Sequence, residues 1–460
     1  MTLGAGRSVA VVGAGLAGSL LACYLARQGF RVAVYERRPD PRKAGYAGGR
    51  SINLALSARG LWALDGVGLK DEVLTHAIPM RGRIVHAAEA NPRLAFQAYG
   101  SRPEHAINSI SRGGLNLALI NAAARHGSVA LYFDRRCTDV DIADASAVFV
   151  KEDGSEERVT ADLIIGADGA FSAVRAALQK TDRFDYSQSY LGHGYKELHI
   201  PPVVGGEGRH GGFALDPGAL HIWPRGSAMM IALPNPDKSF TCTLFWPFEM
   251  LEQLRTREQV SAFFRRHYPD AARLMPTLEE DFLANPVGSL VTVRCFPWVR
   301  HTPRGTVAVL GDAAHAIVPF FGQGMNAAFE DVRVLAECLA ASSGDVRAAA
   351  DECQRLRKPN ADAIAHMALE NFVEMRDKVG SRAFLWRKKF EHAVQGVAPN
   401  AFPSRYEMVS FSTVPYTQAL AAGRKFDRLI RALILGAAAL VVALVAAVLV
   451  MTFWIPRRVD

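Results

Sequence analysis

The chain has 460 residues, a formal net charge of +8, 50% hydrophobic residues and 21% charged residues. A chain of this length is expected to form about two or three domains, and its apolar content excludes a mainly disordered state. Its 39 glycines and 23 prolines are close to average usage, which excludes collagen-like and low-complexity chains. The six cysteines lie far apart without a C-x-x-C pair, so we predict no disulfide framework, no metal site and a reducing compartment.

The N-terminal segment predicts a strand, a glycine turn, a helix and a second strand. Ser8–Val12 is the first strand, and the turn after it has the pattern G-x-G-x-x-G. In such a turn the first glycine allows the bend, the second lets the backbone approach a pyrophosphate, and the third lets the helix pack on the strand. Glu36 ends the second strand, where a carboxylate accepts hydrogen bonds from an adenosine ribose. The predicted dinucleotide site comprises Gly13, Gly15, Leu16, Ala17, Gly18, Glu36 and the neighbouring Arg37 and Arg38.

Later segments place the rest of this domain far along the chain. Residues 80–100 predict two strands around a turn at Asn91-Pro92, Arg112–His126 predicts a helix, and 162–168 predicts a buried strand. A β-rich segment with frequent turn signals runs from about 184 to 300, and helices dominate from Gln323 to about Gly396. We therefore expect an α/β fold in which a Rossmann-like domain is split by an inserted β-sheet domain. The expected boundaries are 1–183 and 301–345 for the dinucleotide-binding domain, 184–300 for the β-rich substrate domain, 346–423 for a helical region over the active site, and 424–460 for the segment described next.

The C-terminal segment predicts a membrane anchor. Residues 432–455 form a run of 24 residues without a charge. At a rise of 1.5 Å per residue this helix would be about 36 Å long, enough to cross a hydrocarbon core of about 30 Å. The alternative is a buried core helix, although such helices rarely run so long without a polar face. Basic residues flank the run: Arg424, Lys425, Arg428 and Arg431 before it, and Arg457 and Arg458 after it.

The flanking charges also predict the orientation. More basic residues precede the span than follow it, and no signal peptide precedes the first strand. We expect a tail-anchored protein whose globular part lies in the cytoplasm, on the inner membrane of a bacterium or the outer mitochondrial membrane of a eukaryote. Residues 424–431 and 457–460 together contribute half of the net charge of +8, so the basic balance indicates a membrane rather than nucleic acid.

Two further motifs indicate which dinucleotide is bound. One runs from Asp162 through Asp168 to Arg175, and the other runs from Gly311 through Asp312 to Asn326. Each is a strand that ends in a turn of small residues with an aspartate, which can accept a hydrogen bond from a ribityl or ribose hydroxyl. With the first motif they resemble the FAD-dependent aromatic hydroxylases. That resemblance implies FAD as cofactor and NADPH as co-substrate, and it extends the cofactor site to Ala55, Arg112, Cys137, Asp168, Gly311, Asp312, Gly324, Met325 and Asn326.

Longer runs narrow the resemblance to the kynurenine 3-monooxygenase family over nearly the whole chain. The runs are 50–57, 78–83, 184–188, 221–225, 239–245 and 317–326. The resemblance implies hydroxylation of L-kynurenine to 3-hydroxy-L-kynurenine with NADPH and O₂ through a flavin hydroperoxide, in tryptophan catabolism toward NAD. The alternatives are a related FAD-dependent hydroxylase or reductase with another amphipathic aromatic substrate, or a membrane-bound flavin-binding protein without turnover. A homodimer is possible.

Kynurenine has a zwitterionic head, whose carboxylate suits an arginine and hydroxyl donors. Arg81 and Arg83 are two residues apart on a predicted strand, and spacing alone does not choose between them. The family's carboxylate-binding arginine matches Arg83, and its partners match Tyr99, Asn371 and Tyr406. The alternative is that each is a surface or scaffold residue.

The aromatic ring of the substrate needs an apolar slot. Met229, Ile231 and Leu233 alternate and so share one face of a strand, although an ordinary sheet core has the same pattern. Leu220 and Phe245 are expected on neighbouring strands, Phe320 near the ring, and Gln323 at a carbonyl of flavin or substrate. We predict a structural role for His315 and name no catalytic side chain, because the cofactor carries the chemistry.

Overall fold

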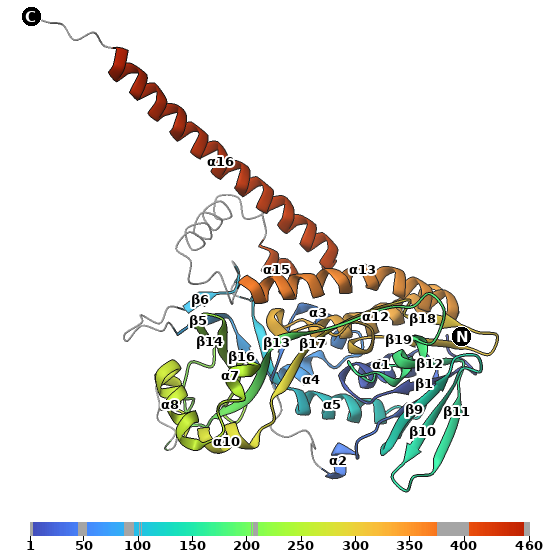
Figure 1. The fold of residues 1–460 in the computed structure, drawn as a ribbon. Helices are drawn as coiled ribbons and strands as arrows, with labels where there is room; N and C mark the ends of the chain where they lie inside the picture. The colour runs from blue at the N-terminus through green and yellow to red at the C-terminus, as the bar shows by residue number, and fades with distance from the viewer. Residues whose placement is uncertain are drawn as a thin grey trace, which may run out of the picture.

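The computed structural model describes residues 3–44, 53–86, 96–100, 102, 104–203, 205, 210–374 and 404–454. The predicted turn at Asn91-Pro92, residues 50–52 of one family run, the helical stretch from 375 to Gly396, and Ile455 at the end of the predicted span lie outside these residues. Figure 1 shows the described part as a globular body from which one long helix, α16 (Tyr416–Trp454), projects.

A six-stranded sheet forms the centre of the dinucleotide-binding domain. Its order is β18-β19-β12-β1-β2-β8, and neighbours are parallel except β18 and β19. Val9 and Val11 lie in one apolar cluster and Ala10 and Val12 in another, so both faces of the sheet are buried. The strands are β1 (Ser8–Val12), β2 (Arg31–Tyr35), β8 (Val129–Tyr132), β12 (Leu163–Gly166), β18 (Val299–His301) and β19 (Thr306–Val309).

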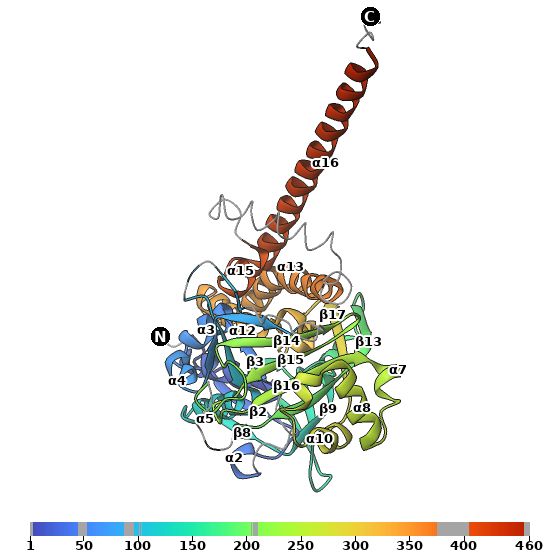
Figure 2. The same ribbon diagram turned by 90° about the vertical axis from the view of Figure 1, so that its left-hand side faces the viewer.

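Different elements cover the two faces of this sheet. Helices α1 (Leu16–Arg27), α5 (Arg112–Ala124) and α12 (Gly324–Ala341) pack together on one face. The other face carries α6 (Ala173–Leu178) and a three-stranded sheet of β9 (Arg135–Asp141), β10 (Ser146–Lys151) and β11 (Glu156–Thr160). Figure 2 shows the same body from the side, with the seven-stranded sheet described next toward the viewer.

The second large sheet has seven strands in the order β17-β13-β16-β15-β14-β5-β6. Two of its strands, β5 (Gly82–Val85) and β6 (Phe96–Ala98), come from before residue 183, so the inserted segment does not form this sheet alone. The others are β13 (Asp185–Ile200), β14 (Ala219–Arg225), β15 (Ala228–Pro234), β16 (Phe240–Pro247) and β17 (Gly288–Phe296). Short helices pack against one face: α7 (Phe248–Leu251), α8 (Arg257–His267), α9 (Pro269–Ala272) and α10 (Leu278–Ala284).

Shorter elements connect these layers. A three-stranded sheet contains β3 (Asn53–Leu56), β7 (Ile107–Ser111) and β4 (Ile78–Met80). The remaining short helices are α2 (Pro41–Ala44), α3 (Ala58–Asp65), α4 (Lys70–Leu74), α11 (Asp312–His315), η1 (Pro319–Phe321) and α15 (Arg405–Ser410). Helix α13 (Val346–Val373) runs across the top of the body in Figure 1, beneath the start of α16.

Helix α16 has two environments along its length. Tyr416, Ala419 and Ile430 are buried against the body, whereas the apolar side chains from Leu433 to Val450 are exposed. Its most apolar window has a mean hydropathy of 3.0, and none of that window is buried. The helix is therefore long and apolar enough to cross a bilayer, and the alternative of a buried core helix does not describe its second half.

A group of buried charges joins α3, α12 and α13. Arg59 pairs with Glu330 at 2.7 Å, and Arg357 pairs with Glu330 at 2.9 Å and with Asp331 at 2.7 Å. All four side chains are less than 10% exposed. Burial would raise the pKa of Asp331, but the charges of His315 and Arg357 outweigh it and lower that pKa. Because each charge has an opposite partner, the group holds the three helices in one arrangement.

We expect Glu330→Gln to lower the free energy of unfolding by about 3–5 kcal/mol, because it leaves Arg59 and Arg357 buried with one carboxylate fewer. Glu337→Gln on the same helix is the matched control. Glu337 pairs with Arg333 at the surface, with 52% of the carboxylate side chain exposed, and such pairs contribute about 0.2–1 kcal/mol. Denaturant unfolding followed by tryptophan fluorescence measures both, and equal losses would contradict the assignment.

Candidate active site

The glycine turn after β1 has the geometry of a phosphate-binding turn. Gly13 has φ of 104°, which favours glycine, and a Cβ on Gly18 would lie 1.9 Å from the Gly13 carbonyl oxygen. A Cβ on Gly15 would meet nothing within 4 Å, so this side of the turn is open. Gly15 is also the N-cap of α1 and supplies no side-chain cap. The first N–H groups of α1, at Leu16, Ala17 and Gly18, therefore remain available to an anionic ligand.

Glu36 is held at the end of β2 beside this turn. One carboxylate oxygen accepts from the Ala14 N–H at 2.9 Å, and the other accepts from the Arg38 N–H at 3.0 Å. The carboxylate is thus fixed next to the glycine turn, where an adenosine ribose is predicted. The side chains of Arg37 and Arg38 are exposed.

Asp168 has an unsatisfied oxygen. Its Oδ2 accepts from the Ala173 N–H at 2.7 Å at the start of α6, while Oδ1 is buried and has no hydrogen-bond partner among the described residues. Burial raises the pKa of Asp168. Burial also raises the pKa of the Cys137 thiol to about 12, and the nearby Asp168 adds to that rise. A buried carboxylate oxygen without a donor is a position for a hydroxyl of a bound ligand.

Asp312 follows β19 and begins α11. More than a third of its surface is accessible, although the surrounding protein atoms raise the pKa of the carboxyl by burial. Burial also raises the pKa of Glu197 on β13, and the charge of Arg112, at the start of α5, partly offsets the rise at both Asp312 and Glu197. Gly311 has φ of 59°, and its N–H donates to Asp331 at 3.1 Å, which ties the turn to the buried charges.

The turn before α12 is fixed to β3 by Asn326. Its amide nitrogen donates to the carbonyls of Ala55 and Gly322, each at 2.8 Å, and its amide oxygen accepts from the Ser57 N–H at 2.9 Å. The Asn326 side chain is therefore used within the protein. Gly324 and Met325 begin α12, whose N-cap residue makes no side-chain cap, so the N–H groups there remain available.

Arg83, Tyr99 and Tyr406 come together from three segments. The Tyr99 and Tyr406 rings stack with centroids 5.3 Å apart. Burial raises the pKa of both tyrosines, and Arg83 lies close enough to lower both. Gln97 on β6 accepts from Arg83 Nε at 3.0 Å and orients the guanidinium. Arg81 lies just before β5, and its carbonyl accepts from the Tyr99 N–H at 3.1 Å, so both arginines lie near this tyrosine. The charge of Arg83 lowers the pKa of both tyrosines, which favours Arg83 as the predicted partner.

The predicted apolar residues form one continuous face of the seven-stranded sheet. Arg83 is the register partner of Leu220, and Met229 is the register partner of Phe245, so these side chains share a face. Two apolar clusters meet at Ile231 on this face. Together the clusters contain Leu220, Met229, Ile231, Leu233, Phe245 and Phe320.

Asn371 and Gln323 have protein partners in this structure. Asn371 Nδ2 donates to the Phe320 carbonyl at 2.7 Å, which places Asn371 beside the apolar face. Gln323 is 1% exposed, its amide oxygen accepts from the Tyr416 hydroxyl at 2.9 Å, and its amide nitrogen donates to Ser57 at 3.3 Å. These bonds hold Gln323 between α12 and α16, and its contact with a carbonyl of flavin or substrate stays a prediction.

His315 is held inside the protein by its neighbours, which favours the predicted structural role. It bonds to Asp331 through Nε2, stacks on Trp298 with centroids 5.2 Å apart, and is 3% exposed.

Sequence reasoning missed three residues at or near the site. Phe411 packs against Tyr99 and Tyr406 with centroids 6.4 and 6.1 Å away. Tyr416 bonds to Gln323 and lies 3.8 Å from the Arg59 guanidinium. Ser57 contacts both Gln323 and Asn326. Only Tyr416 had a signal in the sequence. It is an aromatic residue directly after Pro415, at the start of the helix that leads into the predicted span.

Known proteins resemble this chain in sequence and in fold. The FAD binding domain family matches residues 7–205 and 249–366. A kynurenine 3-monooxygenase of Myxococcus xanthus is 49% identical over 92% of this chain and 90% of its own length, and one of Dictyostelium discoideum is 46% identical over 94% of both. A solved structure of 2-methyl-3-hydroxypyridine-5-carboxylic acid oxygenase, at 22% identity, shares the fold with a TM-score of 0.64 over 82% of this chain and 95% of that one.

The two glycines of the turn predict two different defects. Gly15→Ala adds a methyl group only to open space, so the protein without cofactor should keep its stability while FAD binding weakens. Gly18→Ala should lower the stability of the protein itself, because its methyl group would overlap the Gly13 carbonyl. Flavin fluorescence titration measures the first effect, and thermal unfolding without FAD measures the second. A Gly15→Ala variant with unchanged FAD affinity would contradict the phosphate-binding role of the turn.

Proposed function

The chain belongs to the kynurenine 3-monooxygenase family of FAD-dependent aromatic hydroxylases, and from this premise we propose that it converts L-kynurenine to 3-hydroxy-L-kynurenine with NADPH and O₂. The predicted family, α/β fold class and FAD cofactor are confirmed. One observation carries the choice of substrate: Arg83, beside Tyr99 and Tyr406, lies at the edge of an apolar sheet face. This pairing suits a ligand with an amino-acid head and an aromatic ring.

The residues of the described site fit FAD. The open side of the glycine turn and the N–H groups of α1 would hold the pyrophosphate, and Glu36 would hold the adenosine ribose. The unsatisfied Asp168 Oδ1 offers an acceptor to a hydroxyl, and Asp312 would accept from the ribityl chain. Arg112, Ala55, Gly324 and Met325 complete the proposed cofactor site. FAD supplies the activation of O₂ for transfer of one oxygen atom to an aromatic carbon, with NADPH as the reductant typical of the family.

The protein's own contribution to the reaction is positioning and the exclusion of water. The Arg83 guanidinium would pair with the substrate carboxylate while the hydroxyls of Tyr99 and Tyr406 donate to it. The apolar face of Met229 and Phe245 would then hold the aromatic ring and exclude water from the place where the oxygen atom is transferred. We assign no side-chain base, since His315 is bonded to Asp331 and the aniline nitrogen of the substrate already activates its ring.

We also propose that α16 anchors the protein in a bilayer. Its exposed apolar residues begin directly after Arg431, and four basic residues lie in the two turns before that point. By the positive-inside rule the globular body would face the cytoplasm. The homodimer stays a prediction.

Turnover tests the proposed function. Purified protein with FAD, NADPH and O₂ should convert L-kynurenine to 3-hydroxy-L-kynurenine, as measured by mass spectrometry. 2-Aminoacetophenone, which keeps the aryl ketone and the aniline but has no amino-acid head, should be converted far more slowly because Arg83 has no carboxylate to hold. Absence of product from L-kynurenine with FAD fully bound would refute the proposal. Equal rates for both compounds would favour the alternative, a related hydroxylase with another aromatic substrate.

Substitution of Arg83 tests the carboxylate site. A charge-assisted hydrogen bond contributes about 1.5–3 kcal/mol, so Arg83→Ala should raise KM for L-kynurenine by roughly ten- to 150-fold. The same change should leave KM for 2-aminoacetophenone nearly unchanged. Arg81→Ala is the comparison variant, because Arg81 is also exposed, lies two residues away and bonds to the Tyr99 backbone, so it is the other candidate for the carboxylate. Equal effects of the two substitutions would remove Arg83 from the carboxylate site.

A further inference from the structure

The ring of His105 packs next to the tyrosines of the proposed carboxylate site. It stacks on Phe411 with ring centroids 4.6 Å apart and an angle of 7° between the ring planes. Phe411 in turn packs against Tyr99 and Tyr406, whose rings stack on each other. His105 therefore belongs to one group of four aromatic rings, and this group includes both hydroxyls that we assign to the substrate.

The His105 ring is also held at its edge. Its Nδ1 lies 3.6 Å from Glu407 Oε1, and the backbone N–H of His105 donates to the Arg102 carbonyl at 3.0 Å. Glu407 is itself held in place, because its other carboxylate oxygen accepts from Ser404 Oγ at 3.1 Å in the capping box of α15. Only 17% of the His105 side chain is exposed, so the imidazole occupies one defined position.

The turn after Tyr99 leaves no free space on one side of this imidazole. A Cβ on Gly100 would lie 2.1 Å from His105 Nδ1 and 2.9 Å from Glu407 Oε1. Atoms in a close-packed interior do not approach so closely, so any side chain at position 100 would displace the imidazole. Gly100 directly follows Tyr99, and the backbone that carries this tyrosine is therefore in contact with the ring of His105.

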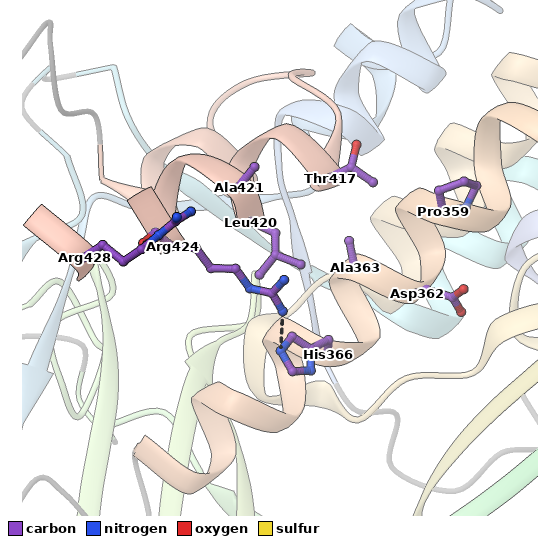
Figure 3. A pocket seen from close by; sticks show the side chains of 9 residues that line it. All are labelled: Pro359, Asp362, Ala363, His366, Thr417, Leu420, Ala421, Arg424 and Arg428. Carbon is purple, nitrogen blue, oxygen red and sulfur yellow. Dashed lines mark hydrogen bonds between the residues drawn. The ribbon is translucent and has the colours of Figure 1, made fainter. Parts of the chain in front are cut away.

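A second set of contacts holds α15 without His105. Arg405 binds Glu370 of α13 at 2.8 Å and Asp427 of α16 at 3.2 Å. One turn away along the same two helices, Arg424 Nη2 lies 3.2 Å from His366 Nε2 (Figure 3). The backbone of α15 is thus tied to the body by ion pairs, whereas the orientation of the aromatic rings at its end depends on the rings next to them.

We propose that His105 is a positioning residue for the substrate carboxylate. By filling the space beside Phe411, its ring keeps Tyr99 and Tyr406 in the orientation in which both hydroxyls and Arg83 can reach one carboxylate. Without the imidazole, Phe411 can turn into the freed space and the two tyrosines lose a wall. This inference rests on the proposed function, and it adds to that function a residue that would contact neither substrate nor cofactor.

Replacement of His105 in the full-length protein with FAD tests the role of its ring. His105→Ala should raise KM for L-kynurenine by about two- to tenfold, the factor that corresponds to one stacked aromatic pair, with little change in kcat. KM for 2-aminoacetophenone should stay unchanged, because this compound has no carboxylate. A purely structural role would weaken both compounds and FAD binding together, and that result would overturn the proposal.

His105→Phe separates the ring from the imidazole nitrogens. It keeps an aromatic ring on Phe411, so KM for L-kynurenine should remain close to the wild-type value. An increase as large as that of His105→Ala would overturn the role that we assign to the ring.

Gly100→Ala tests the same ring without replacing it. The added methyl group must displace the imidazole, so KM for L-kynurenine should rise as it does in His105→Ala. Gly127→Ala is the matched control, because a Cβ on Gly127 would meet nothing within 4 Å. In the double variant the methyl group meets no imidazole, so the combined increase should be smaller than the product of the two single increases. A full product would overturn the proposal, since it would show that the two residues act independently.

Measurements on the wild-type protein keep this test apart from the proposed function. Absence of 3-hydroxy-L-kynurenine from the wild-type reaction with FAD fully bound would refute the proposed function itself. A wild-type protein that turns over L-kynurenine, together with an unchanged KM in both His105→Ala and Gly100→Ala, would refute only the positioning role of His105.

Discussion

The buried ion pairs around α12 are the constraint on which the rest of the structure depends. Arg59, Glu330, Asp331 and Arg357 come from three helices, and removal of any one would leave an uncompensated charge in the interior. Asp331 also accepts from the Gly311 N–H and bonds to His315, so the turn that presents Asp312 is set by the same group. The proposed cofactor site is therefore positioned by charge pairing as well as by the glycine turn.

The same cluster connects the long apolar helix α16 to the proposed active site. Arg59 stacks on Tyr416, and Tyr416 donates to Gln323 at the start of α12. The first turn of α16 thus packs against the turn before α12, while its second half is exposed and apolar. One helix can therefore pack on the globular body with its first half and expose apolar side chains along its second half. Burial ends where the run of uncharged residues begins.

The substrate side depends on a different principle, the alternation of side chains across a sheet. Arg83 and Leu220 face the same way because they are register partners in β5 and β14. A strand pair from before residue 183 joins the inserted sheet, which brings a guanidinium to the edge of an apolar face. The two tyrosines then come from the β6 end and from α15, more than 300 residues apart.

The sequence by itself determined the local chemistry of this protein: the glycine turn, Glu36, the two Asp turns, the alternating face of β15 and the apolar run near the C-terminus. These features were predictable because turn geometry, strand period and span length depend on residues close together in the chain. Only the tertiary structure decided that Arg83 lies near both tyrosines, that Gln323 and Asn326 bond within the protein, and that Tyr416 packs on Arg59. Those choices depend on long-range strand register and on buried charges finding opposite partners, and neither is visible in the spacing of residues along one segment.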